Sequence, residues 1–156
     1  MTAAAALACH AAAVPMIRVR MTRAQSDSTA YSLPAAVHRC RGGGALVSGA
    51  EGAYGVLAWV RAPGGVTPGA YPLLGRADST TPRGALVAVR FLTHEIAHGF
   101  QVDSGTLTLT AAGASFSGRI EGRGLDAAFA TRTQVTIVIE PVAPKADSVA
   151  CGAAPS

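Results

Sequence analysis

The chain has 156 residues, enough for one domain with a single hydrophobic core plus tails, and its 13 Lys and Arg against 9 Asp and Glu give a net charge of +4. The arginines are spread from Arg18 to Arg132, with no run longer than Arg39-Cys40-Arg41 and no interleaved aromatic residues, and the single lysine is Lys145. This pattern argues against a nucleic-acid partner, and no stretch approaches the roughly 18 consecutive apolar residues of a transmembrane helix.

Residues 1–30 are alanine-rich, then basic, then polar, and we find no sustained helical or alternating pattern in them. We interpret them as a signal remnant or a disordered linker. Cys9 follows Ala6-Leu7-Ala8, which partly resembles the cleavage site of a bacterial lipoprotein signal, although no basic residue precedes it. If the true start lies upstream, Cys9 is the lipidated first residue of the mature protein. If Met1 is genuine, the segment is a tail.

Beyond Tyr31, short apolar or alternating runs recur between Gly, Pro, Ser and Asp residues, a pattern typical of an antiparallel sandwich or barrel. The runs are Ala45–Val47, Ala53–Arg61, Ala70–Leu74, Ala85–Thr93, Thr106–Thr110, Ser115–Glu121 and Thr133–Val142. We therefore expect an all-β fold, a single antiparallel β-sandwich of about seven to nine strands. It should occupy residues 31–152, with residues 153–156 as a tail.

Cys40 and Cys151 bracket the part of the chain that we expect to be folded. A disulfide between them would close a loop of about 110 residues, which the chain-entropy model values at roughly 4 to 5 kcal/mol. Such a bond implies an oxidising compartment, so we predict an exported protein, periplasmic or on the cell surface of a bacterium. The alternative is two unrelated buried thiols, because a sequence does not establish pairing.

Three short motifs follow one another along the chain: Pro68-Gly69-Ala70-Tyr71, then Asp103-Ser104-Gly105-Thr106-Leu107-Thr108, then Ser117-Gly118-Arg119. In this order they resemble the turn and strand motifs of uncharacterised β-sandwich domains in bacterial secreted and lipoprotein-like proteins. The similarity spans roughly residues 40–151. It implies a fold and a location, and it implies no activity.

One motif points to a specific catalytic chemistry. His94-Glu95-Ile96-Ala97-His98 is the HExxH signature of zinc peptidases. On a helix, His94 and His98 would share a face and bind Zn²⁺, while Glu95 would activate the metal-bound water. The stretch up to Phe100 is similar to neprilysin-like metallopeptidases, a resemblance that implies these roles. It ends there, because their ExxxD motif is absent and no histidine follows His98.

The conformation of this segment decides whether the motif is a site. A proline at a first-turn position and a glycine terminator favour a helix. The alternation of Val87, Val89 and Phe91 with other residues favours a strand, in which the motif cannot chelate. We predict a strand over residues 85–93 and a strand end or turn over residues 93–99, which would leave both histidines solvated at the surface.

The sequence therefore predicts a non-enzymatic, lipoprotein-like exported module of unknown partner, with no cofactor and no favoured catalytic or metal-binding residue. The alternative is a small zinc-dependent peptidase that uses His94, His98 and Glu95. A further alternative is a sandwich that binds carbohydrate or another ligand, which would need an exposed aromatic cluster. We expect Trp59, the single tryptophan, to be a core aromatic rather than a stacking platform.

Overall fold

The computed structural model describes residues 12–23 and 27–152, and every regular element in these ranges is a β-strand. The expected all-β fold is confirmed, and the described part contains no helix that could span a membrane. The strands are β1 (Met16–Thr22), β2 (Ser28–Pro34), β3 (Ala36–Cys40), β4 (Gly43–Glu51), β5 (Tyr54–Pro63), β6 (Gly69–Pro72), β7 (Gly84–Thr93), β8 (Ile96–Ala112), β9 (Phe116–Asp126), β10 (Thr131–Val142) and β11 (Ser148–Val149).

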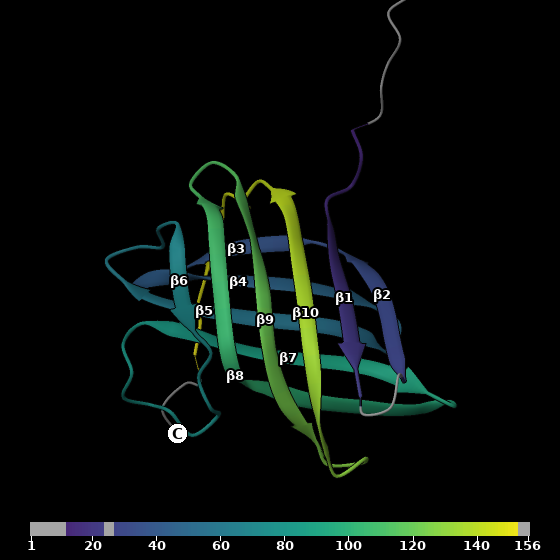
Figure 1. Ribbon diagram of the computed structural model, residues 1–156. Helices are drawn as coiled ribbons and strands as arrows, with labels where there is room; N and C mark the ends of the chain where they lie inside the picture. Colours follow the sequence, from purple (N-terminus) through teal and green to yellow (C-terminus); the bar gives the residue numbers. More distant parts are fainter. Residues whose placement is uncertain (1–11, 24–26, 153–156) are drawn as a thin grey trace, which may run out of the picture.

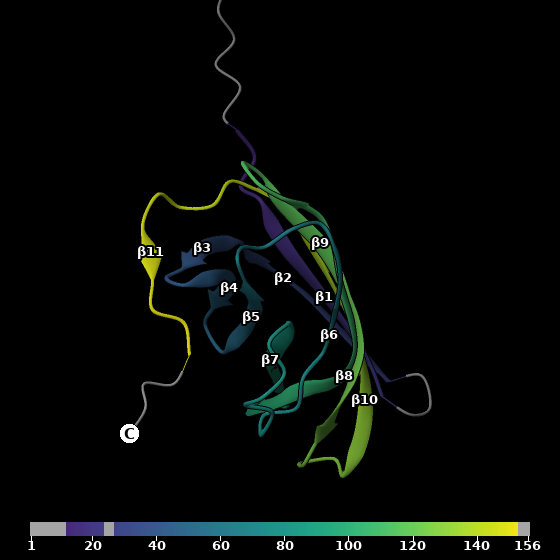
Figure 2. The same cartoon turned by 90° about the vertical axis from the view of Figure 1, so that its left-hand side faces the viewer.

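All eleven strands belong to one sheet in the order β11-β3-β4-β5-β7-β8-β9-β10-β1-β2, with β6 attached to β8. The sheet folds over into two layers, which Figure 1 shows face-on and Figure 2 edge-on. The front layer contains β1, β2, β6, β9, β10 and the second half of β8. The back layer contains β3, β4, β5, β7 and the first half of β8, and its strands run across those of the front layer. The result is a half-barrel.

The 17-residue strand β8 connects the layers because it bends in the middle. Its first part pairs with β7 and its second part with β9 and β6, with a register shift between Val102 and Ser104. At Gly105 the backbone has φ +123°, and a Cβ there would lie 2.1 Å from the carbonyl oxygen of Glu121. Only glycine fits this conformation and this close approach.

The expectation of a sandwich of about seven to nine antiparallel strands needs correction. Residues 12–23 and 27–152 form eleven strands in one continuous sheet, and β11 pairs with β3 in parallel. The residues Asp103-Ser104-Gly105, which precede the expected run Thr106–Thr110, lie inside β8 and do not separate two strands. They bend one, so that a single strand serves both layers.

The predicted boundary at residue 31 is also wrong. Strand β1 lies within the expected linker and pairs with both β10 and β2. Its residues Ile17, Val19 and Met21 are at most 2% exposed and belong to the core between the layers. The predictions made for Cys9 and for the tail at residues 153–156 lie outside the described residues.

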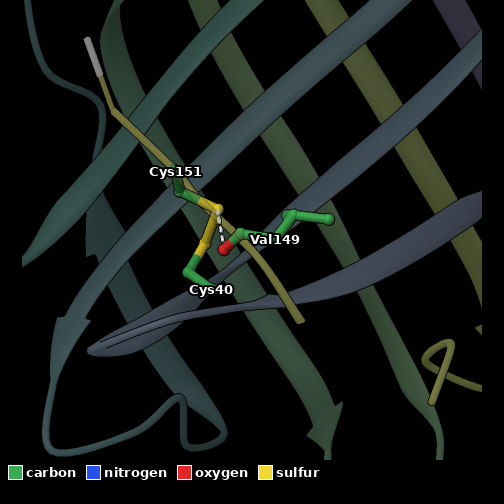
Figure 3. Close-up of a disulfide and its surroundings, with 3 residues drawn as sticks. All are labelled: Cys40, Val149 and Cys151. Carbon is green, nitrogen blue, oxygen red and sulfur yellow. Dashed lines mark hydrogen bonds between the residues drawn. A yellow bond between two sulfur atoms is a disulfide. The ribbon is translucent and has the colours of Figure 1, made fainter. Parts of the chain in front are cut away.

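The predicted disulfide between Cys40 and Cys151 is confirmed. It lies where the C-terminal segment runs beside β3, and the Arg41 amide donates a hydrogen bond of 2.9 Å to the carbonyl oxygen of Val149. Figure 3 shows the bond at the end of β3 with Val149 next to it. The bond therefore holds the C-terminal segment against the outside of the back layer.

Candidate functional site

The HExxH motif forms a β-hairpin. His94 and Glu95 are the two turn residues between β7 and β8, and Thr93 pairs with Ile96 across the turn. Both turn residues have positive φ, 48° and 66°, as a type I′ turn requires. The predicted strand over residues 85–93 is confirmed. The strand end or turn that we predicted over residues 93–99 is shorter, because only His94 and Glu95 form the turn and β8 begins at Ile96. The helix on which the zinc-peptidase alternative depends does not form.

The hairpin sends the motif's side chains to different environments. His94 and Glu95 are exposed at the tip. His98 is half-buried rather than solvated, because its ring stacks between Phe91 and Phe129 with centroid distances of 5.3 and 4.9 Å. Within the described ranges, no group of three or more His, Cys, Asp or Glu side chains could hold a metal ion. The two imidazoles therefore do not form a zinc site of the expected kind.

Arg23 closes the same end of the half-barrel and is only 7% exposed. Its guanidinium lies over the rings of Phe91 and Phe129, at 5.4 and 5.2 Å from their centroids. It also donates hydrogen bonds to the Asp27 carboxylate (2.9 Å) and the Thr29 hydroxyl (2.7 Å). The first of these bonds is the main cause that lowers the pKa of Asp27. Sequence reasoning missed this cluster because it placed Arg23 in a linker.

Four buried polar atoms at this end have no hydrogen-bond partner among the described residues: Arg23 Nη1, Thr93 Oγ1, Asp126 Oδ2 and Thr133 Oγ1. Orphaned buried polar groups are rare and mark places where water or a small polar molecule is accommodated. None of the grooves on the two outer faces is lined by these residues. The cluster is therefore a buried polar part of the core and not an accessible binding site.

The outer face of the front layer is polar. A groove of about 560 Å³ on it is lined by Arg18, Arg20 and Arg119, together with Thr and Ser side chains. Two of these arginines are already paired, Arg18 with Glu140 at 2.6 Å and Arg119 with Glu121 at 2.9 Å. Exposed pairs of this kind are common on solvated surfaces and contribute little energy. This groove is therefore a weak candidate for a binding site.

The outer face of the back layer is apolar. The strand register aligns Leu46, Trp59 and Leu86 in one row across β4, β5 and β7, and Leu57 with Ala88 in the next. Leu57 is 48% exposed. When one face of an antiparallel sheet covers the core, the other face normally carries polar residues. The front layer follows this rule and the back layer does not, which is typical of an interaction surface.

This apolar face is hollowed into a groove, the back-layer groove, in two connected parts. The larger part has a volume of about 460 Å³ and the smaller about 280 Å³, and they share Leu57, Ala88 and Val89. The residues that line both parts are Ser48, Ala50, Gly55, Val56, Leu57, Trp59, Arg76, Leu86, Val87, Ala88, Val89, Arg90, Gly99, Phe100 and Gln101. None of these lining residues is acidic.

Trp59 is not the core aromatic that we expected. It is half-buried on the outer face, where the guanidinium of Arg61 lies 4.7 Å from the ring centroid. A Cβ at Gly152 would lie 3.1 Å from the indole, so the segment held by the disulfide contacts it directly. The sequence contains a pattern that indicates this placement. Residues 56–60 are continuously apolar, so both faces of β5 carry apolar side chains.

Comparisons with known proteins return nothing that resembles this chain: no protein family matches it, nor does any curated protein or solved structure.

Proposed function

We propose that this protein is a non-catalytic, exported binding module that holds an apolar ligand in the back-layer groove. The observation that carries the proposal is the contrast between a polar outer face on the front layer and an apolar one on the back layer. Exposing Leu57 and Trp59 to water is unfavourable, and a ligand that covers them removes this cost.

The groove has the size and lining of a small-molecule site. Such sites have volumes of about 300 to 1,000 Å³ and apolar walls with a few polar groups, and the larger part alone, at about 460 Å³, lies within that range. Its walls stand on β5 and β7, strands that are paired on both sides, and on the first part of β8, which pairs with β7. A site on such strands is held more rigidly than a site on loops.

The proposal is non-catalytic because of what surrounds the groove. Its polar lining side chains are Ser48, Gln101 and two arginines, without a histidine, cysteine or carboxylate to act as general base. The one motif with a known chemistry forms the tip of a hairpin. Export is supported by the Cys40–Cys151 disulfide, which persists in oxidising compartments. We propose a periplasmic or cell-surface location, with a lipid on Cys9 as the anchor.

Trp59 provides a direct test because it is the single tryptophan and it lines the groove. We expect the neutral probe N-phenyl-1-naphthylamine to bind the purified, oxidised protein with a rise in its own fluorescence and energy transfer from Trp59. Leu57→Gln should weaken binding, because it places an amide in the middle of the groove.

Val138→Gln is the matched control, since Val138 lies on the outer face of the front layer in β10. It should bind the probe like the unchanged protein. Circular dichroism checks that each variant is folded. If the folded protein does not bind the probe, or if the two variants lose binding equally, the proposed site is wrong.

A further inference from the structure

We infer that the ligand of the back-layer groove is a free, single-chain carboxylate amphiphile, a long-chain fatty-acid anion, with its carboxylate at Arg76. This inference rests on the function proposed above and adds the chemical class of the ligand.

The shape of the groove favours a chain. Its two parts join across β7 at Ala88, so the apolar floor continues from the Ala50 and Gly55 end to the Phe100 end. Glycines at positions 55 and 99 leave the floor without side chains at both ends. A flexible alkyl chain fits such a continuous apolar channel along its length, and each methylene that it buries adds affinity.

Charge favours an anionic head group at one end. Arginines stand at both ends of the groove, and its lining residues include no carboxylate. The guanidinium of Arg90 is partly occupied, since its Nε and Nη2 donate to the carbonyl oxygens of Ala53 (3.1 Å) and Gly52 (3.4 Å). Arg76 is exposed and forms no side-chain hydrogen bond or ion pair with residues 12–23 or 27–152. It is therefore the arginine with donors to offer to a carboxylate.

Gln101 positions the segment that carries Arg76. Its side-chain amide donates a hydrogen bond of 3.0 Å to the carbonyl oxygen of Leu74, two residues before Arg76. Leu74 is also tied to β7, because its amide donates to the carbonyl oxygen of Ala85 at 2.8 Å. The Arg76 backbone is thus fixed next to the groove, and the amide of Gln101 carries a second N–H that can reach the same head group.

Other occupants fit less well. A peptide that adds to a sheet as an extra strand needs a free strand edge, whereas β5 and β7 are paired on both sides. A bilayer surface is engaged by several projecting apolar side chains, whereas Leu57 alone among the large apolar residues that line the groove is exposed. A second copy that packed the same face against this one would bring two more arginines and no carboxylate, so it would offer Arg76 no charge partner.

The test is a titration followed by Trp59 fluorescence, with the oxidised full chain and monomeric ligands below their micelle concentrations. The ligands are decanoate, dodecanoate, dodecanol and dodecylammonium. Dodecanoate should bind roughly 3- to 10-fold more tightly than decanoate, because two methylenes are partly buried. It should also bind about 2- to 5-fold more tightly than dodecanol, which is the size of an exposed ion pair.

Variants at Arg76 distinguish the contribution of the ligand's head group to binding from that of its alkyl chain. Arg76→Gln should abolish the preference for dodecanoate over dodecanol, and Arg76→Glu should reverse it in favour of dodecylammonium. Arg20→Glu makes the same charge change in the polar groove on the outer face of the front layer, which Arg20 lines. It should leave the order of ligand affinities unchanged. The neutral naphthylamine probe should bind both Arg76 variants like the unchanged protein.

Each outcome separates the two proposals. If the neutral probe binds but dodecanoate shows no preference, or if Arg76→Gln retains the preference, the ligand class is wrong and the site stands. If neither the probe nor any alkyl ligand binds, both proposals fail. Binding only to anionic phospholipid vesicles, or dimerisation that Leu57→Gln abolishes without any alkyl binding, would identify a membrane or a second copy as the occupant and overturn the inference.

Discussion

The turn formed by the HExxH motif makes an unusual prediction: breaking the motif should stabilise the protein. His94 and Glu95 adopt φ values of 48° and 66°, in the left-handed region that L-residues with bulky side chains disfavour. The double variant His94→Asn with Glu95→Gly introduces Asn-Gly, the pair that type I′ turns prefer. Both side chains are exposed, so no core packing is lost.

The expected gain follows from the backbone. A left-handed L-residue costs roughly 1 to 2 kcal/mol relative to glycine. Glycine at position 95 recovers this, less about 0.4 to 1 kcal/mol for the greater freedom of the unfolded chain. Asparagine at position 94 adds a few tenths, so the double variant should gain about 1 kcal/mol. For a domain of this size, that raises Tm by roughly 3 to 4 °C.

The assay is urea unfolding followed by circular dichroism, in which the midpoint should rise with an unchanged m-value. Ala130→Gly is the matched control: Ala130, in the loop between β9 and β10, also has a positive φ, 51°, and lies outside the motif. It should stabilise for the same reason. A double variant that is less stable than the unchanged protein would refute the turn, as would stoichiometric zinc that the variant loses.

Three further predictions concern the disulfide, the packing of the core and the loss of stability at low pH. Replacing Cys40 and Cys151 with serine should cost at most about 4.8 kcal/mol in urea unfolding, the loop entropy for a separation of 111 residues, and no measurable loss would contradict the loop argument. Phe91→Ala should cost about 3 to 5 kcal/mol in the same assay, because its buried ring also packs against His98 and Arg23. The hydrogen bond from Arg18 is the first cause that lowers the pKa of Glu140, so its stabilisation is present above the ordinary pKa of 4.5 and is lost in acid. Glu140→Gln should therefore flatten the acid limb of the stability profile, and an unchanged limb would argue against the pair.

The disagreements between sequence and structure have identifiable physical causes. In β1, Ile17, Val19 and Met21 alternate with polar residues, yet alanines before them and polar residues after them hid the pattern. In β5 the apolar residues are continuous, so the sequence does not say which of them face the core. That choice depends on pairing with β4 and β7, which are distant along the chain. Trp59 was assigned to the core for this reason.

The candidate site was less predictable than the fold because it is assembled from distant segments. Arg76 and Gln101 are 25 positions apart in the sequence, and the structure links them through the hydrogen bond that the Gln101 amide donates to the Leu74 carbonyl oxygen. Arg23 is buried because Phe91 and Phe129, from two other strand ends, surround its guanidinium. Neither arrangement leaves a pattern in the local sequence.

The sequence by itself determined the strand content and the strand before the HExxH motif, because alternation is visible along the chain. It suggested the pairing of Cys40 with Cys151, which the structure confirmed. Tertiary structure alone decided the rest. It bent β8 so that one sheet forms both layers, narrowed the predicted turn to His94 and Glu95, and left the outer face of β5 and β7 uncovered. The physical reason is that burial is a property of long-range pairing, and the same residues have different roles on the two faces of a sheet.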